Sequence, residues 1–432
     1  MKKIFLTALF LYTLPVVAKI GDVLTLNEAY QQTLKQSESL AIQDETIRIA
    51  AAHYEEALGT VLPHLDVNSS ELVQDTTSNS SGSSSSVTST LTKRSRPEVA
   101  LTLTQPLFQG FREFRALRIS SVEKQKDKFD TQRARQLLFA DVARAYYTVL
   151  EVEKELQIQQ SIFSALQKRK GELENRVKLG RSRESELLST ESDSASTQAD
   201  IEKTKGMVAT ARDMLGFLVG QPVKESLVDE FKVPAILPSL EKLEMISENR
   251  PDLGAAAANT RLAKGEVNYN KGALLPTLGL IGNYYPYRTG YQKNIKWDVN
   301  FGLTVPLFEG GALRGPIKES EAQLKQAQLT QQETNRQAKL ELTQAYHNLT
   351  ASQAETSALQ LASNKAKANF DSLSNEYNLN LVNNLEVLDG LKTWHDKRVE
   401  ANQIYFQTKL YYLDLLIASG QIPETLVSEV QP

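Results

Sequence analysis

Residues 106–110 read PLFQG, and residues 306–310 read PLFEG. The same offset of 200 residues carries Tyr146 onto Tyr346. One register held over so long a stretch is typical of a duplicated sequence, which has to be recognised before a fold is assigned. The predicted parts are a first repeat at residues 19–220, a linker at 221–239, a second repeat at 240–420 and a C-terminal tail at 421–432.

Strand patterns lie ahead of both copies of this motif. Apolar residues occupy alternate positions between Ile295 and Val305, and again between Val99 and Leu103. Period-two alternation predicts a strand with one apolar face. A Ser/Thr-rich stretch at residues 76–89 has the composition of a loop. We expect strand pairs at about residues 64–106 and 277–306.

Long helices are predicted after each strand pair. All 14 prolines lie outside residues 107–221 and 317–422, and proline disrupts a helix interior. Apolar residues from Leu138 to Leu156 recur at spacings of four and three, which is a coiled-coil pattern. Gly180 and its counterpart Asn380 suit the left-handed residue that ends a helix. The predicted helices are one at residues 26–59 and two helical hairpins at about 110–220 and 310–420.

The N-terminal residues have the features of an export signal. Two lysines precede an apolar run at residues 4–14, and a small-residue cleavage site follows at residues 16–18. We therefore predict a signal peptide at residues 1–18. No later stretch is long and apolar enough for a transmembrane helix, so the exported chain is expected either in the periplasm or, as β-strands, in the outer membrane.

The composition argues against several classes of function. The net charge is −3 without a basic stripe, so nucleic acid is not an expected partner. The chain has no cysteine, and its four histidines show no metal-ligand spacing, so neither a metal nor another cofactor is expected. No nucleophile elbow, phosphate loop or paired-carboxylate motif stands out, and we expect no enzyme activity.

The strand pairs permit two interpretations. Their apolar faces could cover a soluble core, as in a periplasmic coiled-coil scaffold. Alternatively they span a membrane, in which case four strands per chain are too few, because open strand edges in lipid leave backbone groups unpaired. Three copies would supply twelve strands, enough to close a barrel. The aromatic residues expected at a membrane interface are Tyr284, Tyr285, Tyr287 and Trp297.

The whole pattern resembles the TolC family of outer-membrane efflux and secretion ducts. The resemblance rests on the export signal, the duplicated strand pair with its long helical hairpin, the repeated PLFxG, and NRPDL at residues 249–253. It implies a homotrimer with a shared 12-stranded barrel in outer membrane lipid and a periplasmic helical tunnel. It also implies two partners, a periplasmic adaptor (membrane fusion) protein and an inner-membrane transporter.

The resemblance further implies a gate at the periplasmic helix tips. An acidic ring would come from Glu386 and Asp389, and Tyr377 would link to Glu186. The family's gate arginine is replaced by Val382, and the nearby arginines are possible substitutes: Arg181 and Arg183. The adaptor would dock on the tips, which comprise Leu179, Gly180, Arg181, Ser182, Leu379, Asn380, Leu381 and Val382.

The leading prediction is therefore a passive, gated outer-membrane channel, a mixed membrane protein of TolC-like fold. A soluble periplasmic scaffold is the first alternative. A cell-wall hydrolase is the second, although it requires a catalytic constellation that the sequence does not display. Drugs, metals and proteins all remain open as substrates.

Overall fold

The computed structural model describes residues 23–75, 94–290 and 292–422. The predicted signal peptide, the Ser/Thr-rich stretch at residues 76–89 and most of the C-terminal tail lie outside these ranges. Within the described part of the chain, no helix combines the length and the apolar character needed to cross a membrane.

Two compact units share the chain, and each draws on both sequence repeats. We call one the tip unit (Met1–Lys35, Val142–Lys232 and Ala362–Phe406). We call the other the sheet unit (Gln36–Asp141, Val233–Leu361 and Gln407–Pro432). These units describe packing and not duplication, so the repeat boundaries stay a prediction.

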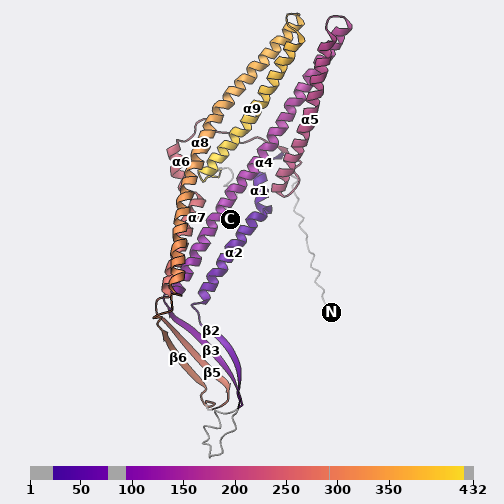
Figure 1. The fold of residues 1–432 in the computed structure, drawn as a ribbon. Helices are drawn as coiled ribbons and strands as arrows, with labels where there is room; N and C mark the ends of the chain where they lie inside the picture. Colours follow the sequence, from indigo (N-terminus) through magenta and orange to yellow (C-terminus); the bar gives the residue numbers. More distant parts are fainter. Residues whose placement is uncertain (1–22, 76–93, 291, 423–432) are drawn as a thin grey trace, which may run out of the picture. The chain divides into compact units, whose positions relative to one another are not determined.

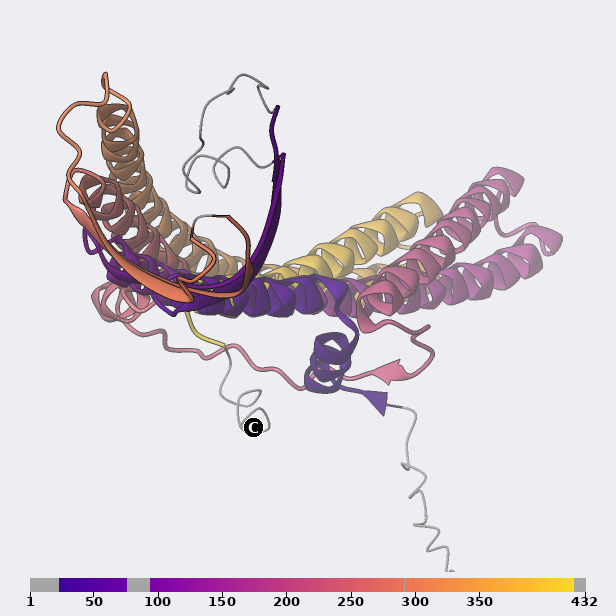
Figure 2. The same ribbon diagram turned by 90° about the horizontal axis from the view of Figure 1, so that it is seen from below.

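The sheet unit is built on one antiparallel sheet, in the order β2-β3-β5-β6 (Figure 1). Figure 2 shows that the sheet is strongly curved. The four strands and the helical hairpins confirm the predicted TolC-like element pattern. The strands are β2 (His64–Val73), β3 (Ser95–Gln109), β5 (Thr277–Arg288) and β6 (Trp297–Thr304).

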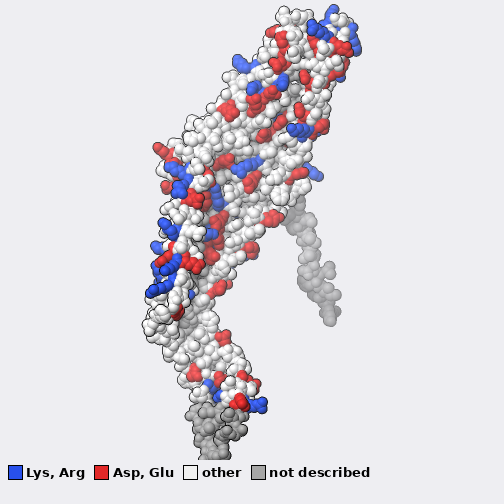
Figure 3. Space-filling model, viewed as in Figure 1, with Lys and Arg blue, Asp and Glu red and all other residues white. Residues whose placement is uncertain are grey.

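One face of this sheet is apolar and exposed. Val67 pairs with Leu101, Leu101 with Tyr284, and Tyr284 with Trp297. Val67 is 70% exposed and Trp297 is 67% exposed, so none of the described residues covers that face. In Figure 3 the sheet surface is largely free of charged side chains except towards one end.

The opposite face carries a polar ladder that crosses all four strands. Asn68 Nδ2 donates to Thr102 Oγ1, Thr102 Oγ1 donates to Asn283 Oδ1, and Asn283 Nδ2 donates to Asp298 Oδ1. The donor–acceptor distance is 2.9 Å in each of these bonds. The hydroxyl of Tyr285 donates to the other carboxylate oxygen of Asp298 over 2.9 Å. Cross-strand bonds of this kind fix the register, because a one-residue slip would send the polar groups to the apolar face.

The repeated motif marks the exit from the sheet. β3 continues three residues past Pro106, where the sequence pattern placed its end, because a bulge between Pro106 and Phe108 keeps it paired with β5. Gly110 then has φ +69°, and a Cβ there would lie 2.2 Å from the carbonyl oxygen of Gly272. Only glycine fits this close approach between two backbones.

The sheet unit also contains three whole helices: α2 (Glu38–Gly59), α6 (Leu240–Ser247) and α7 (Pro251–Gly272). It includes parts of three longer ones: α4 (Arg112–Lys178), α8 (Arg314–Asn378) and α9 (Asn384–Ala418). The helix predicted at residues 26–59 is in fact two, α1 (Leu26–Gln36) and α2, because the side chain of Ser37 accepts a hydrogen bond from Leu40 N and starts a new helix.

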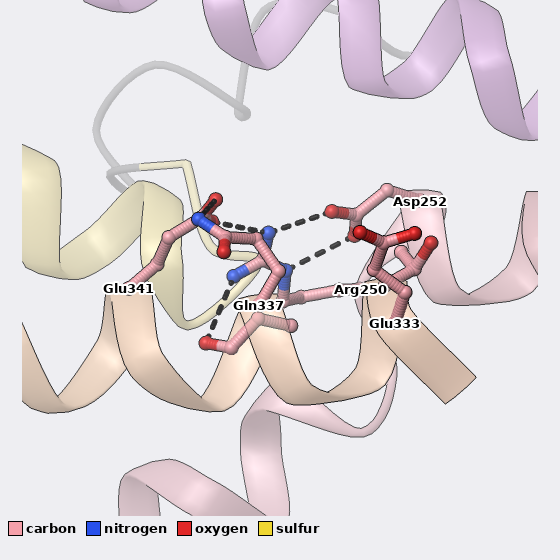
Figure 4. A pocket seen from close by; sticks show the side chains of 7 residues that line it. Arg250, Asp252, Glu333, Gln337 and Glu341 are labelled. Carbon is pink, nitrogen blue, oxygen red and sulfur yellow. Dashed lines mark hydrogen bonds and ion pairs between the residues drawn. The ribbon is translucent and has the colours of Figure 1, made fainter. Parts of the chain in front are cut away.

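The NRPDL residues join three helices of the sheet unit (Figure 4). The guanidinium of Arg250 donates to Asp252 Oδ2 over 2.6 Å, to Glu341 Oε2 over 2.8 Å and to the carbonyl of Ala418 over 3.0 Å. Burial by itself lowers the pKa of Arg250, but the hydrogen bonds to both carboxylates outweigh it, so the pKa is raised. The motif is therefore a paired, buried charge that holds α7, α8 and the end of α9 together.

The tip unit contains α1, the two-residue parallel strands β1 (Val23–Leu24) and β4 (Ser226–Leu227), α5 (Glu184–Val219) and the adjoining parts of α4, α8 and α9. The α4–α5 and α8–α9 turns lie at the same end of this unit (Figure 1). We call these turns the helical tips, residues 179–183 and 379–383.

Candidate functional site

Both helical tips end their first helix in the same way. Gly180 has φ +66° and Asn380 has φ +59°, the left-handed conformation that the sequence predicted. The amide of Arg181 then donates to the carbonyl of Arg176 over 2.8 Å, and the amide of Leu381 to that of Glu376 over 2.9 Å. These bonds span six residues, as in a Schellman cap. The duplication has preserved the backbone of the tips.

Tyr377 and Glu186 lie together at the tips. The Tyr377 hydroxyl donates to Glu186 Oε2 over 3.4 Å, which joins α8 to α5. The same carboxylate oxygen accepts a hydrogen bond from Ser182 Oγ over 2.6 Å. Tyr377 is 5% exposed, and its ring packs in an apolar cluster with Leu173 and Val387.

Arg169, on α4, is the cation closest to this tyrosine. Its Cζ lies 3.6 Å from the centroid of the Tyr377 ring, and the Cζ of Arg176 lies 4.5 Å from it. Burial lowers the pKa of Arg169, only partly offset by Tyr377 and Glu172. A guanidinium this close to an aromatic face is attracted to it, and more strongly when water is excluded.

Asn384 connects the arginine to the other hairpin. Its Oδ1 accepts a hydrogen bond from Arg169 Nε over 2.9 Å, and its Nδ2 donates to Thr190 Oγ1 over 3.1 Å and to the Glu186 carbonyl over 3.3 Å. Asn384 is 1% exposed. We call Arg169, Tyr377, Glu186 and Asn384 the tip lock, since they come from α4, α8, α5 and α9.

Val382 occupies the position at which the family resemblance implies an arginine. Its side chain is half-buried and packs against the apolar cluster around Tyr377. The cation that contacts Tyr377 comes from α4 instead. Sequence reasoning missed Arg169, although a signal was present: Ile162, Leu166, Arg169 and Leu173 follow the coiled-coil spacing, with arginine in an apolar position.

Glu386 and Asp389 are both exposed on the first turns of α9. Glu386 also has a local role. Its amide donates to Asn383 Oδ1 over 3.1 Å, and Asn383 Nδ2 donates to Glu386 Oε1 over 2.8 Å. The Asn383 side chain therefore caps the first turn of α9, which stabilises the start of the helix. The structure gives the two acids the expected helix and spacing, and their part in a gate stays a prediction.

Arg181 and Arg183, proposed from sequence as substitute gate cations, are exposed, and neither side chain has a partner among the described residues. The apolar tip residues differ in exposure. Leu179, Leu379 and Leu381 are each close to 70% exposed, whereas Val382 is half-buried. The exposed leucines are the apolar part of the tip surface. The polar part consists of Gly180, Arg181, Ser182 and Asn380.

The four aromatic residues proposed for a membrane interface divide between the sheet faces. Tyr284, Tyr287 and Trp297 lie exposed on the apolar face. Tyr285 is 7% exposed and belongs to the polar ladder, with Arg288 Cζ 4.0 Å from its ring centroid. Tyr285 faces away from Tyr284 because neighbouring residues of a strand alternate. A bulge opposite Ala100 then shifts the alternation of β5 by one residue and returns Tyr287 to the apolar face.

Metal-ligating side chains do not gather anywhere in the described residues: no three histidine, aspartate or glutamate side chains are placed to hold one ion. The features that remain are a two-faced sheet and an interlocked pair of helical tips.

Comparison with known families identifies the family of this chain. The model of the family described as outer membrane efflux protein matches residues 29–221 and 243–415. The chain belongs to this family. The two matched segments correspond closely to the two predicted repeats. Membership locates the chain in the outer membrane, as predicted from the sequence. It also favours a channel over a soluble periplasmic scaffold.

Two curated relatives illustrate the range of the family. The proteases secretion protein PrtF of Dickeya chrysanthemi is 24% identical over 42% of this chain, and the match spans 40% of PrtF. The outer membrane protein TolC of Vibrio cholerae serotype O1 is 22% identical over 72% of this chain and 74% of its own length.

The fold is shared with solved structures. A membrane protein from Pseudomonas aeruginosa superposes with a TM-score of 0.82 at 19% identity, over 93% of this chain and 92% of that one. The TolC-like fold predicted from the sequence is thereby confirmed.

Proposed function

We propose that three copies of this chain form one outer-membrane channel that passively conducts substrates exported by an inner-membrane transporter and a periplasmic adaptor. The observation that carries the proposal is the two-faced sheet. An exposed apolar face backed by a hydrogen-bonded polar ladder suits a wall between lipid and a watery lumen.

The sheet needs further copies for a physical reason. Its edge strands, β2 and β6, each have one side without a neighbour in the sheet. Unpaired backbone groups in lipid cost several kcal/mol each, so the edges must pair with strands of other chains. Three four-stranded sheets make twelve strands, within the range of barrels that enclose a polar lumen. Tyr284, Tyr287 and Trp297 would then face the lipid interface.

The tip lock is the proposed gate. It joins the two helical hairpins of one chain through the Tyr377–Glu186 hydrogen bond and the Arg169–Asn384 hydrogen bond, so that separating the hairpins breaks both. Glu386 and Asp389 would line the constriction and favour cations. Arg181 and Arg183 would lie at its entrance.

The exposed leucines of the helical tips are proposed as the adaptor-docking surface. Leu179, Leu379 and Leu381 present exposed apolar side chains at one end of the unit, and clustered exposed apolar side chains are typical of interaction sites. PrtF is named for protease secretion, which supports type I secretion, and the family description supports efflux. The transporter would choose between these substrates.

Planar-bilayer conductance of the purified protein, with its mass measured alongside, tests the proposal. A trimer that gives small, cation-selective currents is expected. Replacing both Glu386 and Asp389 with alanine should raise the conductance and weaken the cation preference. A monomer without channel activity would contradict the channel, and an unchanged double variant would contradict the acidic ring alone.

A further inference from the structure

A groove of about 440 Å³ runs along the tip unit between α4, α5 and α9. It is distinct from the tip lock, none of whose residues lines it. Its volume is within the range of small-molecule sites.

Carboxylates line the rim of the groove at regular intervals. Asp193 and Asp200 lie seven residues apart on α5, and Asp389 and Asp396 lie seven apart on α9. Seven residues are two helical turns, so each pair lies along one face of its helix. Within the described residues, the carboxylates of Asp193, Asp200 and Asp389 have no ion-pair or hydrogen-bond partner. The basic side chains in the lining are Lys392 and His395, and His395 Nδ1 lies 3.2 Å from Asp396 Oδ1.

A second, independent feature points to a ligand. Gln159, on α4, lines the groove and is 5% exposed. Its Nε2 donates to Glu155 Oε1 over 3.2 Å, but its Oε1 is buried without a partner among the described residues. Buried acceptors are rarely left unpaired, and a ligand that brings an N–H group to this oxygen would satisfy it.

The floor of the groove is apolar. Ile162, Leu166, Leu388 and Leu391 form one buried cluster, and all four line the groove. Trp394 packs against the same cluster. A ligand that fits this floor carries a ring or an alkyl body as well as a charge.

We propose that this groove binds small organic cations that combine an apolar body with an N–H-bearing ammonium group. The apolar body lies on the leucine floor, the ammonium is held between the carboxylates of α5 and α9, and one N–H donates to Gln159 Oε1. The inference goes beyond the proposed channel, since binding depends only on the tip unit's side chains.

Trp394 provides the readout. The chain has two tryptophans, and Trp297 lies in the sheet. In full-length Trp297→Phe protein, Trp394 is the remaining emitter. Titration with 2-phenylethylammonium at neutral pH should change its emission saturably, whereas 3-phenylpropanoate, of similar shape and opposite charge, should not.

Variants separate the groove from the general charge of the protein. Asp193→Asn with Asp200→Asn should weaken binding at least tenfold. Glu202→Gln with Asp213→Asn removes the same charge from α5 outside the groove and should leave the affinity unchanged. Gln159→Leu should weaken 2-phenylethylammonium but not phenyltrimethylammonium, which has no N–H.

Three results would overturn the proposal: no saturable change with the ammonium, equal affinity for the carboxylate probe, or equal losses from the two double variants. Conductance enters none of these measurements, so a failure of binding leaves the proposed channel standing, and a failure of the channel leaves the binding result standing.

Discussion

Replacement of Arg169 by methionine is the sharpest test of the tip lock. Methionine is long, flexible and apolar, so it fills the buried space without the charge. The change removes the hydrogen bond from Nε to Asn384 Oδ1 and the contact with the Tyr377 ring at 3.6 Å. It leaves Asn384 Oδ1 buried without its donor.

The magnitude follows from these contacts. A hydrogen bond from a charged donor contributes about 1.5–3 kcal/mol. The cation–π contact contributes roughly 0.5–2 kcal/mol. Burial of the charged guanidinium is itself unfavourable, as the lowered pKa of Arg169 indicates. Removing the charge relieves this cost and offsets part of the sum. We expect a net loss of about 2–3 kcal/mol per chain, and hence a roughly 30- to 150-fold shift of each chain from locked to unlocked tips.

Single-channel recording measures this shift. Arg169→Met should spend far more time in high-conductance states than the unaltered protein. Arg169→Lys should be intermediate, because lysine keeps the charge but loses the planar group that stacks on the ring. Arg336→Met is the matched control, since it removes an exposed arginine of α8 outside the helical tips, and its conductance should not change.

Two results would refute the reasoning. One is an Arg169→Met protein that assembles normally and conducts like the unaltered protein. The other is an equal increase in Arg336→Met, which would mean that the loss of any positive charge, and not of the lock, raises the conductance. Mass and circular dichroism, measured on each variant, separate these results from misfolding.

Three further predictions concern stability. Gly110→Ala should lower the melting temperature far more than Gly310→Ala, because both have positive φ but only Gly110 abuts a backbone; thermal unfolding of the pair checks this. Burial alone would raise the pKa of Asp252, but its arginine partners lower that pKa below 3.8. The stability that the ionised carboxylate contributes is therefore present at neutral pH and is lost as pH falls through the lowered pKa. In denaturant unfolding, Asp252→Asn should be less stable than the parent at pH 7 and should converge with it in acid. Burial, with the charge of the nearby Glu155, raises the pKa of Glu151 from 4.5 to about 7. The parent should therefore lose stability as pH rises between these two values. In Glu151→Gln, the free energy of unfolding measured with denaturant should depend less on pH over this range.

Periodicity was sufficient to predict the strands of the four-stranded sheet and the long helices of the two hairpins. The alternation of Trp297 with its neighbours and the heptads of the helices are local patterns, and the hydrophobic effect acts on them directly. The helical tips were predictable for a similar reason, because Gly180 and Asn380 are residue types that tolerate positive φ. Such features need no knowledge of distant contacts.

The features that were missed depend on contacts between distant segments. Arg169 donates a hydrogen bond to Asn384, which lies 215 positions later in the sequence, and no local pattern predicts that contact. Alternation alone would place Tyr287 on the face of Tyr285, but a bulge returns it to the apolar face, and a bulge arises from the pairing of two strands rather than from either one. Ser37 is a weaker case, since serine is a common helix start that lay inside an otherwise helical run.

The origin of the cation beside Tyr377 has a consequence for classifying relatives. A sequence search that requires arginine at the position of Val382 would conclude that these tips lack a cation beside the tyrosine, although the Arg169 guanidinium lies 3.6 Å from the centroid of the Tyr377 ring. In this chain the guanidinium beside Tyr377 comes from α4, a different helix from the one that the resemblance implies. Ancestry in such proteins is therefore better traced through which groups meet in space than through which column of an alignment they occupy.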